Sequence, residues 1–364
     1  MVFKTMRLGD VLELRRGFDL PKSKREKGCV PVYSSSGISG YHSVSAVDGP
    51  CLVTGRYGTI GQVFYSEKPC WPLNTSLYAT EFKGNNSRFL YYFLKTLPWE
   101  SYATASAVPG INRNHVNAIP VCLPDLECQV GIASLLGALD DKIALNNQLN
   151  GYLEELADGM FRRHFGGLTD NATLADFANV TMGQSPAGSS YNEAGIGTIF
   201  YQGRAEFGWR YPTQRLSTTE PKRMAKAGDV LMSVRAPVGD LNLAYEDCCI
   251  GRGLAAIHCD YPSYGLYLMR SLHKKLDAYN GEGTVFGSIN GKALNGLPIA
   301  LPNNAAIRAF EKEAAPIDTQ IRNNEVESRV LVTLRDTLLP KLMSGEIDVS
   351  KVDLTQLNSH LADC

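Results

Sequence analysis

The sequence predicts a mixed α/β (α+β) protein in which two α/β domains are separated by a pair of long antiparallel helices. The first observation is an internal repeat, because Ile111–Pro124 recurs as Ile289–Pro302 at a displacement of 178 positions. The second is that each of these segments runs into a stretch whose apolar residues are spaced by seven, as in a coiled coil. A solenoid unit spans only a few dozen residues. The chain therefore contains a unit of one domain and one helix twice, and a pseudo-twofold axis is expected to relate the two copies.

Each repeat is expected to begin with short strands and long loops, because its first part is rich in Gly, Ser and Pro. The strand candidates are 51–54, 61–65 and 77–82 in the first repeat, and 229–234, 241–245 and 254–259 in the second. An amphipathic helix follows at 87–97 and at 263–276, and a strand ending at Pro124 or Pro302 closes each domain. The pattern is typical of α/β domains of roughly 120 to 140 residues.

The end of each repeat predicts a long helix. The heptad positions are Ile132, Leu139, Asn146, Leu153 and Met160 in the first repeat, and Phe310, Ile317, Asn324, Leu331 and Leu338 in the second. At 1.5 Å per residue, about 38 residues give a helix on the order of 57 Å long. Asn146 and Asn324 occupy matching seam positions, where a buried amide would fix the register of an antiparallel pair. The alternative is that both lie beside the seam and face water.

Domain bounds follow from these elements. They are 1–126 for the first domain, 127–165 for its helix, 166–302 for the second domain, 303–345 for its helix and 346–364 for a C-terminal tail. Apolar residues make up 44% of 364 residues, which is ordinary for a globular protein. No apolar run has the length of a signal peptide or a membrane span, so we expect a cytoplasmic protein without a membrane partner. Nine irregularly placed cysteines suggest neither disulfides nor a zinc site, and we expect no metal and no cofactor.

Positive charge is concentrated early in each repeat, although the net charge is only −1. Residues 15–27 hold six Arg or Lys against two acids, and residues 204–226 hold the same numbers. By contrast, residues 125–158 carry seven acids and one base. Basic clusters are often only solvated surfaces, but a cluster in the same place in both repeats favours a polyanionic partner.

This layout resembles the specificity subunit of type I restriction-modification enzymes, commonly called HsdS. The resemblance is carried by the motif I-N-x-x-x-[VL]-x-x-[IL]-P-[VI]-x-L-P at Ile111–Pro124 and Ile289–Pro302, by the helix after each, by VRAPVGD at Val234–Asp240 and by LLPKLMSGEIDV at Leu338–Val349. It implies two target-recognition domains that read a bipartite sequence in double-stranded DNA. It also implies methyltransferase subunits, two of them, and restriction or motor subunits as partners. The first repeat departs from the loop motif, with RYGTIG from Arg56 to Gly61.

The chemistry of DNA reading selects the candidate site residues. Lys and Arg neutralise phosphates, whereas bidentate Arg reads guanine and Asn or Gln reads adenine. The candidates are Arg15, Arg16, Lys22, Lys24, Arg25, Ser35, Arg56, Tyr57 and Arg113 in the first repeat, and Gln202, Arg204, Arg235 and Lys292 in the second. Arg56 and Arg235 are interpreted as equivalent strand ends before glycine-bearing loops, although an Arg at such a place is often only a surface ion-pair residue. Asn112 and Asn290 are expected to cap helices or turns rather than to contact DNA.

No catalytic residue is predicted. The chain has no G-x-x-x-x-G-K-[ST] phosphate loop, no G-x-S-x-G, no H-E-x-x-H and no N-P-P-[YF] or D-P-P-[YF] of the kind amino-methyltransferases use. We therefore expect a non-catalytic subunit that reads DNA sequence and recruits its partners through the helices. Two alternatives stay open, namely a two-domain scaffold that binds protein or polysaccharide and an enzyme with its site between the domains.

Overall fold

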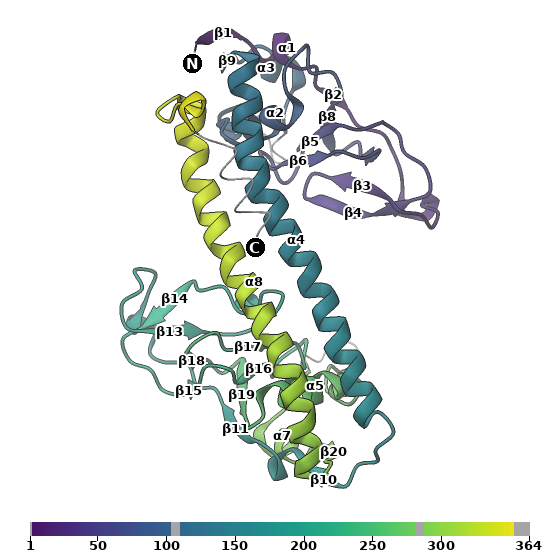
Figure 1. Ribbon diagram of the computed structural model, residues 1–364, viewed down its shortest axis with the longest axis vertical. Helices are drawn as coiled ribbons and strands as arrows, with labels where there is room; N and C mark the ends of the chain where they lie inside the picture. Colours follow the sequence, from purple (N-terminus) through teal and green to yellow (C-terminus); the bar gives the residue numbers. More distant parts are fainter. Residues whose placement is uncertain (1, 103–109, 282–286, 353–364) are drawn as a thin grey trace. The chain divides into compact units, whose positions relative to one another are not determined.

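The computed structural model describes residues 2–102, 110–281 and 287–352, and the chain forms two compact units (Figure 1). The first unit contains Met1–Asn146 and Val326–Cys364, and the second contains Asn147–Glu325. Helices α4 (Leu126–Phe165) and α8 (Asn304–Ser344) each contribute one stretch to both units. The predicted mixed α/β fold with two long helices is confirmed. Of the predicted tail 346–364, residues 353–364 lie outside the described residues.

The first unit contains an antiparallel four-stranded sheet, a three-stranded sheet, a two-stranded ladder and short helices. In sheet order the strands are β2 (Arg15–Arg16), β8 (Ser76–Ala79), β5 (Cys51–Gly55) and β6 (Val63–Ser66); then β4 (Gly37–His42), β3 (Val30–Ser34) and β7 (Trp71–Pro72); then β1 (Phe3–Arg7) and β9 (Pro120–Pro124). The helices are α1 (Leu8–Val11), α2 (Ser87–Lys95) and α3 (Arg113–Asn117). Three predicted strands and the amphipathic helix therefore form as β5, β6, β8 and α2.

The second unit repeats this plan with a larger second sheet. Its strands are β11 (Asn179–Met182), β19 (Leu254–His258), β16 (Val230–Ser233) and β17 (Leu241–Leu243); then β12 (Tyr191–Asn192), β14 (Leu216–Thr218), β13 (Thr198–Tyr201), β18 (Cys248–Ile250) and β15 (Met224–Ala225); then β10 (Ala172–Thr173) and β20 (Pro298–Ile299). The helices are α5 (Pro262–Ser271), α6 (His273–Asp277) and α7 (Gly291–Asn295). The single helix expected over 263–276 is thus two, because α5 ends at Ser271.

Sheet register shows the repeat directly and also where it changes. Leu52 pairs with Ala79, and Val230 pairs with Ile257, so both strands keep the displacement of 178. Strand β2 does not keep this displacement. Arg16 of β2 pairs with Leu77, and Met182 of β11 pairs with Ala255, which lies 178 positions after Leu77. The counterpart of Arg16 is therefore Met182, at a displacement of 166. Twelve extra residues therefore lie between β11 and β16, in the segment that builds the larger second sheet.

The stretches of α4 and α8 that share a unit run antiparallel. In the first unit, Arg335 is 2.6 Å from Asp140, and Asn146, later in α4, donates to Glu327, earlier in α8, at 2.7 Å. In the second unit, Asn324 donates to Asn150 at 2.8 Å. Asn146 and Asn324 are 3% and 4% exposed, so both are buried and neither faces water.

Each domain packs its apolar helix and sheet faces on its own stretch of the long helices. In the first unit, α2 buries Phe89, Leu90 and Tyr92 in a core that includes Ile132 of α4 and Leu342 of α8. The Asn86 side chain caps α2 by accepting a hydrogen bond from the Phe89 amide at 2.9 Å. The core of the second unit likewise contains Phe161 of α4 and Phe310 of α8.

Candidate nucleic-acid interface

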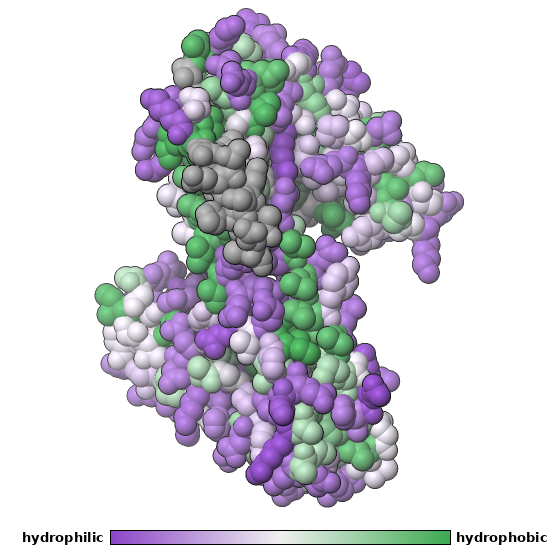
Figure 2. Space-filling view, in the orientation of Figure 1, coloured by the Kyte–Doolittle hydropathy of each residue, from purple (hydrophilic) through white to green (hydrophobic). Residues whose placement is uncertain are grey.

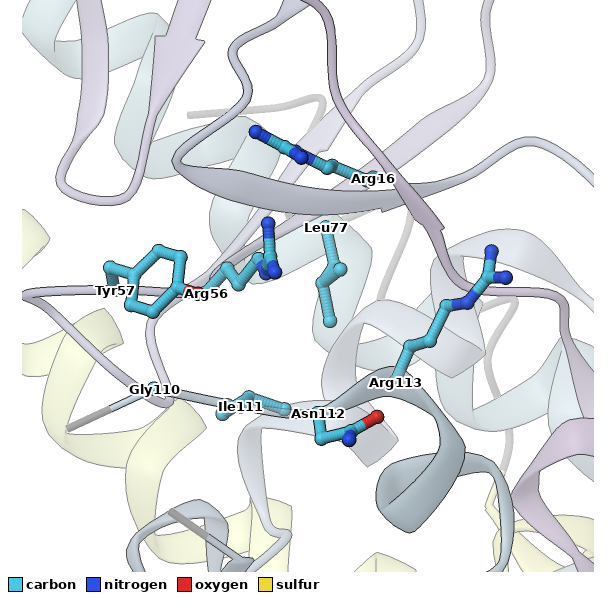
Figure 3. Close-up of a pocket in the computed structure, with 8 residues that line it drawn as sticks. All are labelled: Arg16, Arg56, Tyr57, Leu77, Gly110, Ile111, Asn112 and Arg113. Atoms are coloured by element: carbon cyan, nitrogen blue, oxygen red, sulfur yellow. The ribbon is translucent and has the colours of Figure 1, made fainter. Parts of the chain in front are cut away.

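A pocket of about 500 Å³ lies in the first unit where β5 ends and α3 begins. Its lining includes the guanidinium groups of Arg16, Arg56 and Arg113 and the apolar side chain of Leu77. Figure 3 shows Arg16 on one side of the space, the Gly110–Asn112 backbone on the opposite side, and Arg56 and Arg113 at the flanks. None of the three arginines pairs with a carboxylate within the described part of the chain. Three unneutralised cations around one opening favour an anionic partner.

Tyr57 shapes the rim of this pocket. The Arg56 guanidinium lies 4.7 Å above the centre of the Tyr57 ring, a cation–π contact. The ring packs so closely on Gly110 that a Cβ there would lie 2.4 Å from a ring carbon. Tyr57 is 39% exposed, and the Ser35 hydroxyl lies beside the next residue, Gly58. An exposed aromatic ring with a guanidinium on it can contact a base or a sugar.

The second unit has a pocket at the corresponding place, with a volume of about 650 Å³. It lies between the end of β16 and the start of α7, and Arg235 and Arg252 supply its cations. Neither arginine has a carboxylate partner among the residues that the structure describes. Arg252 was not predicted from the sequence. The sequence feature that could have identified Arg252 is its place between two glycines, Gly251 and Gly253, in the loop after β18. Both glycines pack against the backbone of Gln202.

The predicted equivalence of Arg56 and Arg235 is wrong by one residue. The Ile111 amide donates to the Arg56 carbonyl at 2.9 Å, and the Ile289 amide donates to the Val234 carbonyl at 3.1 Å. Isolated bridges join Tyr57 to Gly110 and Arg235 to Ser288. The counterpart of Arg235 is therefore Tyr57, and that of Arg56 is Val234. The sequence pattern matches two arginines by type, whereas the backbone pairing decides their positions.

Other candidates in the first unit lie outside this pocket. Arg15 follows the alternation of β2 onto the face opposite Arg16 and is 2.9 Å from Glu13. Arg25 donates to the Ser39 carbonyl at 2.9 Å. Lys22 and Lys24 are exposed on a single 3₁₀ turn.

In the second unit, the structure neutralises much of the predicted basic cluster. Arg204 pairs with Asp240, and Arg215 is 2.7 Å from Glu206. Arg210 is buried, with Asp318 as its partner. Lys222, Arg223 and Lys226 stay exposed. Three of the six cations in 204–226 are therefore paired, Arg215 with an acid of the same cluster and the other two with the more distant Asp240 and Asp318.

The structure confirms that Asn112 and Asn290 cap helices. Their side chains accept hydrogen bonds from the amides of Asn114 and Ala293 at 3.0 and 2.9 Å, at the first turns of α3 and α7. Lys292 is exposed on α7, next to the pocket residue Gly291. The caps fix the chain where it passes each pocket.

No group of three His, Cys, Asp or Glu side chains within residues 2–102, 110–281 and 287–352 could hold a metal ion. The eight cysteines in these ranges are free thiols. Among the described helices, none is both long and apolar enough to cross a membrane.

Comparison with known proteins places these features in a family. Residues 2–155 match the model of the type I restriction modification DNA specificity domain. A relative named as the MjaX type I restriction enzyme specificity subunit, from Methanocaldococcus jannaschii, is 31% identical over 290 residues, which cover 72% of this chain and 68% of the relative. The HindI specificity subunit of Haemophilus influenzae is 21% identical over 331 residues, covering 66% and 71%. The crystal structure of a type I S subunit from M. genitalium matches 94% of this chain and 96% of its own at a TM-score of 0.66 and 16% identity, which shows a shared fold.

Proposed function

This chain belongs to the specificity subunits of type I restriction-modification enzymes, and we propose that each of its two units reads one part of a bipartite DNA target. The family function is recognition of DNA sequence, as one component of an assembly with other subunits. The observation that carries the proposal is the arginine-lined pocket at the same point of the fold in both units. A protein-binding scaffold would give no reason for unneutralised guanidinium groups at both places.

Substitution of one arginine in each pocket tests whether each unit reads its own half of the target. We expect Arg56→Ala to relax reading of one half of the target and Arg235→Ala the other, each at a cost of about 1–3 kcal/mol for the bidentate pair of hydrogen bonds that is removed. Arg15→Ala is the matched control, because Arg15 neighbours Arg16 on β2 but pairs with Glu13. Genome-wide methylation mapping of the assembled enzyme gives the result. Uniform weakening at all sequences would make these residues phosphate contacts instead.

We further propose that the long helices bind two methyltransferase subunits at equivalent places. Tyr152 and Leu156 of α4 are 60% and 53% exposed, and their counterparts 178 positions later, Val330 and Leu334 of α8, are 61% and 42% exposed. Figure 2 shows apolar residues gathered along α4. Exposed apolar groups at helical spacing are typical of protein contacts. A repeated pair favours two copies of one partner, with restriction or motor subunits joining that complex.

Mass measurement of the co-expressed complex tests this stoichiometry. Tyr152→Asp with Leu156→Asp should remove one methyltransferase copy, and Val330→Asp with Leu334→Asp the other, because a buried charge opposes docking. Val130→Asp is the control, since Val130 is 49% exposed on α4 but its counterpart in the repeat is Arg308. Retention of both copies by both double variants would refute these docking sites.

The chain itself is proposed to be non-catalytic and to act in the cytoplasm, where its DNA is. The purified chain should show no methyl transfer, cleavage or ATP hydrolysis. Activity that stays with the chain through several columns from a partner-free host would contradict this.

We also propose the predicted domain bounds, 1–126 and 166–302, and that the length of the long helices sets the distance between the two half-sites, so that the helices act as a ruler. Adding one heptad to both helices should change the spacer between the half-sites, because each helix lengthens by about 1.5 Å per residue and each turn of DNA advances about 34 Å. The sequences of the half-sites themselves should stay the same. A spacer indifferent to helix length would refute the ruler.

A further inference from the structure

A network of charged side chains joins the second domain to both long helices, apart from the reading pockets. Arg210, in the loop between β13 and β14, is 3% exposed and pairs with Asp318 of α8. The same guanidinium is 3.3 Å from Glu154 of α4. Tyr267 of α5 donates its hydroxyl hydrogen to Asp318 at 2.8 Å. One arginine thus ties a loop of the domain to α4 and α8 together.

Arg270 of α5 extends this network along α4. Its guanidinium is 2.7 Å from Glu154 and 2.8 Å from Asp158. Burial lowers the pKa of both Arg210 and Arg270, but the facing carboxylates outweigh it and raise each pKa above its ordinary value. Burial also raises the pKa of Tyr267, so its hydroxyl keeps its proton and stays a donor. Two cations, three carboxylates and one hydroxyl make up the network.

The first unit has a smaller arrangement at the corresponding place. Tyr92 of α2 donates to Asp140 of α4 at 2.6 Å, and Arg335, which comes from α8, is 2.6 Å from the same carboxylate. Arg88 of α2 pairs with Asp141, also on α4. In the described part of the first unit, these charged contacts connect the domain to α4 alone. In the second unit, the charged contacts connect the domain to both helices.

Stability alone does not explain this network. Buried ion pairs gain little net free energy, because the loss of hydration offsets their attraction, and replacing a whole pair by apolar groups is often neutral or stabilising. Their hydrogen bonds are directional, so they can select one arrangement of the groups that they join. We propose that the Arg210 network is a positioning device that holds the second recognition domain at one angle on its stretch of α4 and α8. Its pocket then meets DNA in a fixed phase relative to these helices. The inference rests on the proposed reading of one half-site by each unit.

The test removes the central pair without leaving an orphaned charge. In the full chain assembled with its methyltransferase, Arg210→Met is combined with Asp318→Leu, and Glu154 keeps Arg270 as its partner. Binding is measured to DNA with the native spacer, with the spacer changed by one base pair, and with only the second half-site intact. We expect the preference for the native spacer to fall from about tenfold to about threefold or less, while half-site affinity changes by less than about twofold. Tyr267→Phe, which removes only the hydroxyl donor, should give a smaller fall of the same kind.

The exposed pair Lys275 and Asp170 of the same unit provides the control. Lys275→Met with Asp170→Leu also removes one pair of opposite charges, where the side chains are 35% and 45% exposed, and should leave spacer preference unchanged. An unchanged spacer preference in the Arg210 variant and in Tyr267→Phe would overturn the proposal. So would a parallel fall in thermal midpoint, half-site affinity and full-site affinity, which would indicate a purely structural role. Failure of the unmodified assembly to prefer either half-site would instead refute the proposed function.

Discussion

The two units have the same fold around their pockets, but they place arginines at different positions of it. The counterparts of Arg16 and Arg56 are Met182 and Val234, and the counterpart of Arg252 is Asn74, whose side chain donates to Asp19 at 3.0 Å. The loop backbone is duplicated, whereas the charged groups that line it are not. A repeated scaffold therefore allows the two proposed half-sites to differ, because each copy has its own set of charged groups in its pocket.

The units differ also in how their charges are buried, and the largest expected effect follows from this. Arg210→Ala leaves Asp318 without its buried cation and should lower the free energy of unfolding by about 3–5 kcal/mol. Arg335→Ala in the first unit should cost only about 1 kcal/mol, because the Arg335 side chain is 18% exposed against 2% for Arg210, so water already screens its pairing with Asp140. Denaturant unfolding, followed by a probe in each unit, measures both. Equal losses of unfolding free energy would show that Arg210 and Arg335 contribute equally to the stability of their units.

The second prediction concerns the pockets. Arg252→Ala should relax discrimination at one position of the half-site that we propose for the second unit, by about 1–3 kcal/mol, because a guanidinium in this pocket can donate a bidentate pair of hydrogen bonds to a base. Asn74→Ala, at the same place in the first unit, should leave both half-sites unchanged, since Asn74 is engaged by Asp19. Competition binding with single-base variants of each half-site separates the two. Weaker discrimination by Asn74→Ala would mean that the units read DNA with matching positions after all.

The third prediction compares the residues that face these loops. Gly110→Ala should displace Tyr57, because the new Cβ would lie 2.4 Å from its ring, and should weaken reading of the first half-site at a cost of about 1–3 kcal/mol. Ser288→Ala, at the corresponding place, should change binding by less than about 0.5 kcal/mol, because Ser288 is exposed and already carries a Cβ. Half-site affinities of the two variants test the contrast. An unaffected Gly110→Ala would remove Tyr57 from the interface.

The sequence predicts the duplicated strands and helices, but it does not predict the loops and charged groups in which the two units differ. Short apolar runs predict β5 and β8, and heptad spacing predicts the long helices, because strands and helices bury apolar residues at fixed periods. The paired strands then keep the displacement of 178 found in the sequence. The displacement of 166 at β2 is invisible in the sequence, because the twelve extra residues lie between β11 and β16, in a segment of very short strands and loops that has no apolar period. Arg56 and Arg235 match by residue type, and one position of backbone register overturns the match.

Ion pairing is the other feature that the sequence does not predict. The partners of Arg204, Arg210 and Arg215 include Asp240 and Asp318, which lie 36 and 108 positions away from the arginines they neutralise. A run of basic residues reports charge along the chain, whereas affinity for DNA depends on the charge left over after folding.

The smallest expected effect compares one residue or pair from each basic cluster, 204–226 and 15–27, and tests whether ion pairing in the folded chain decides their effect on DNA affinity. Arg204→Ala should change DNA affinity by about 0–1 kcal/mol and leave the slope of log affinity against log salt unchanged, because Asp240 already neutralises Arg204. Lys22→Ala with Lys24→Ala should reduce the slope by about 0.9 for each phosphate that is no longer neutralised, since both lysines are exposed. Titration of DNA binding between low and moderate salt measures the slopes. A reduced slope for Arg204→Ala would show that DNA takes this arginine from Asp240, and the second unit would then contact phosphates through its paired charges as well.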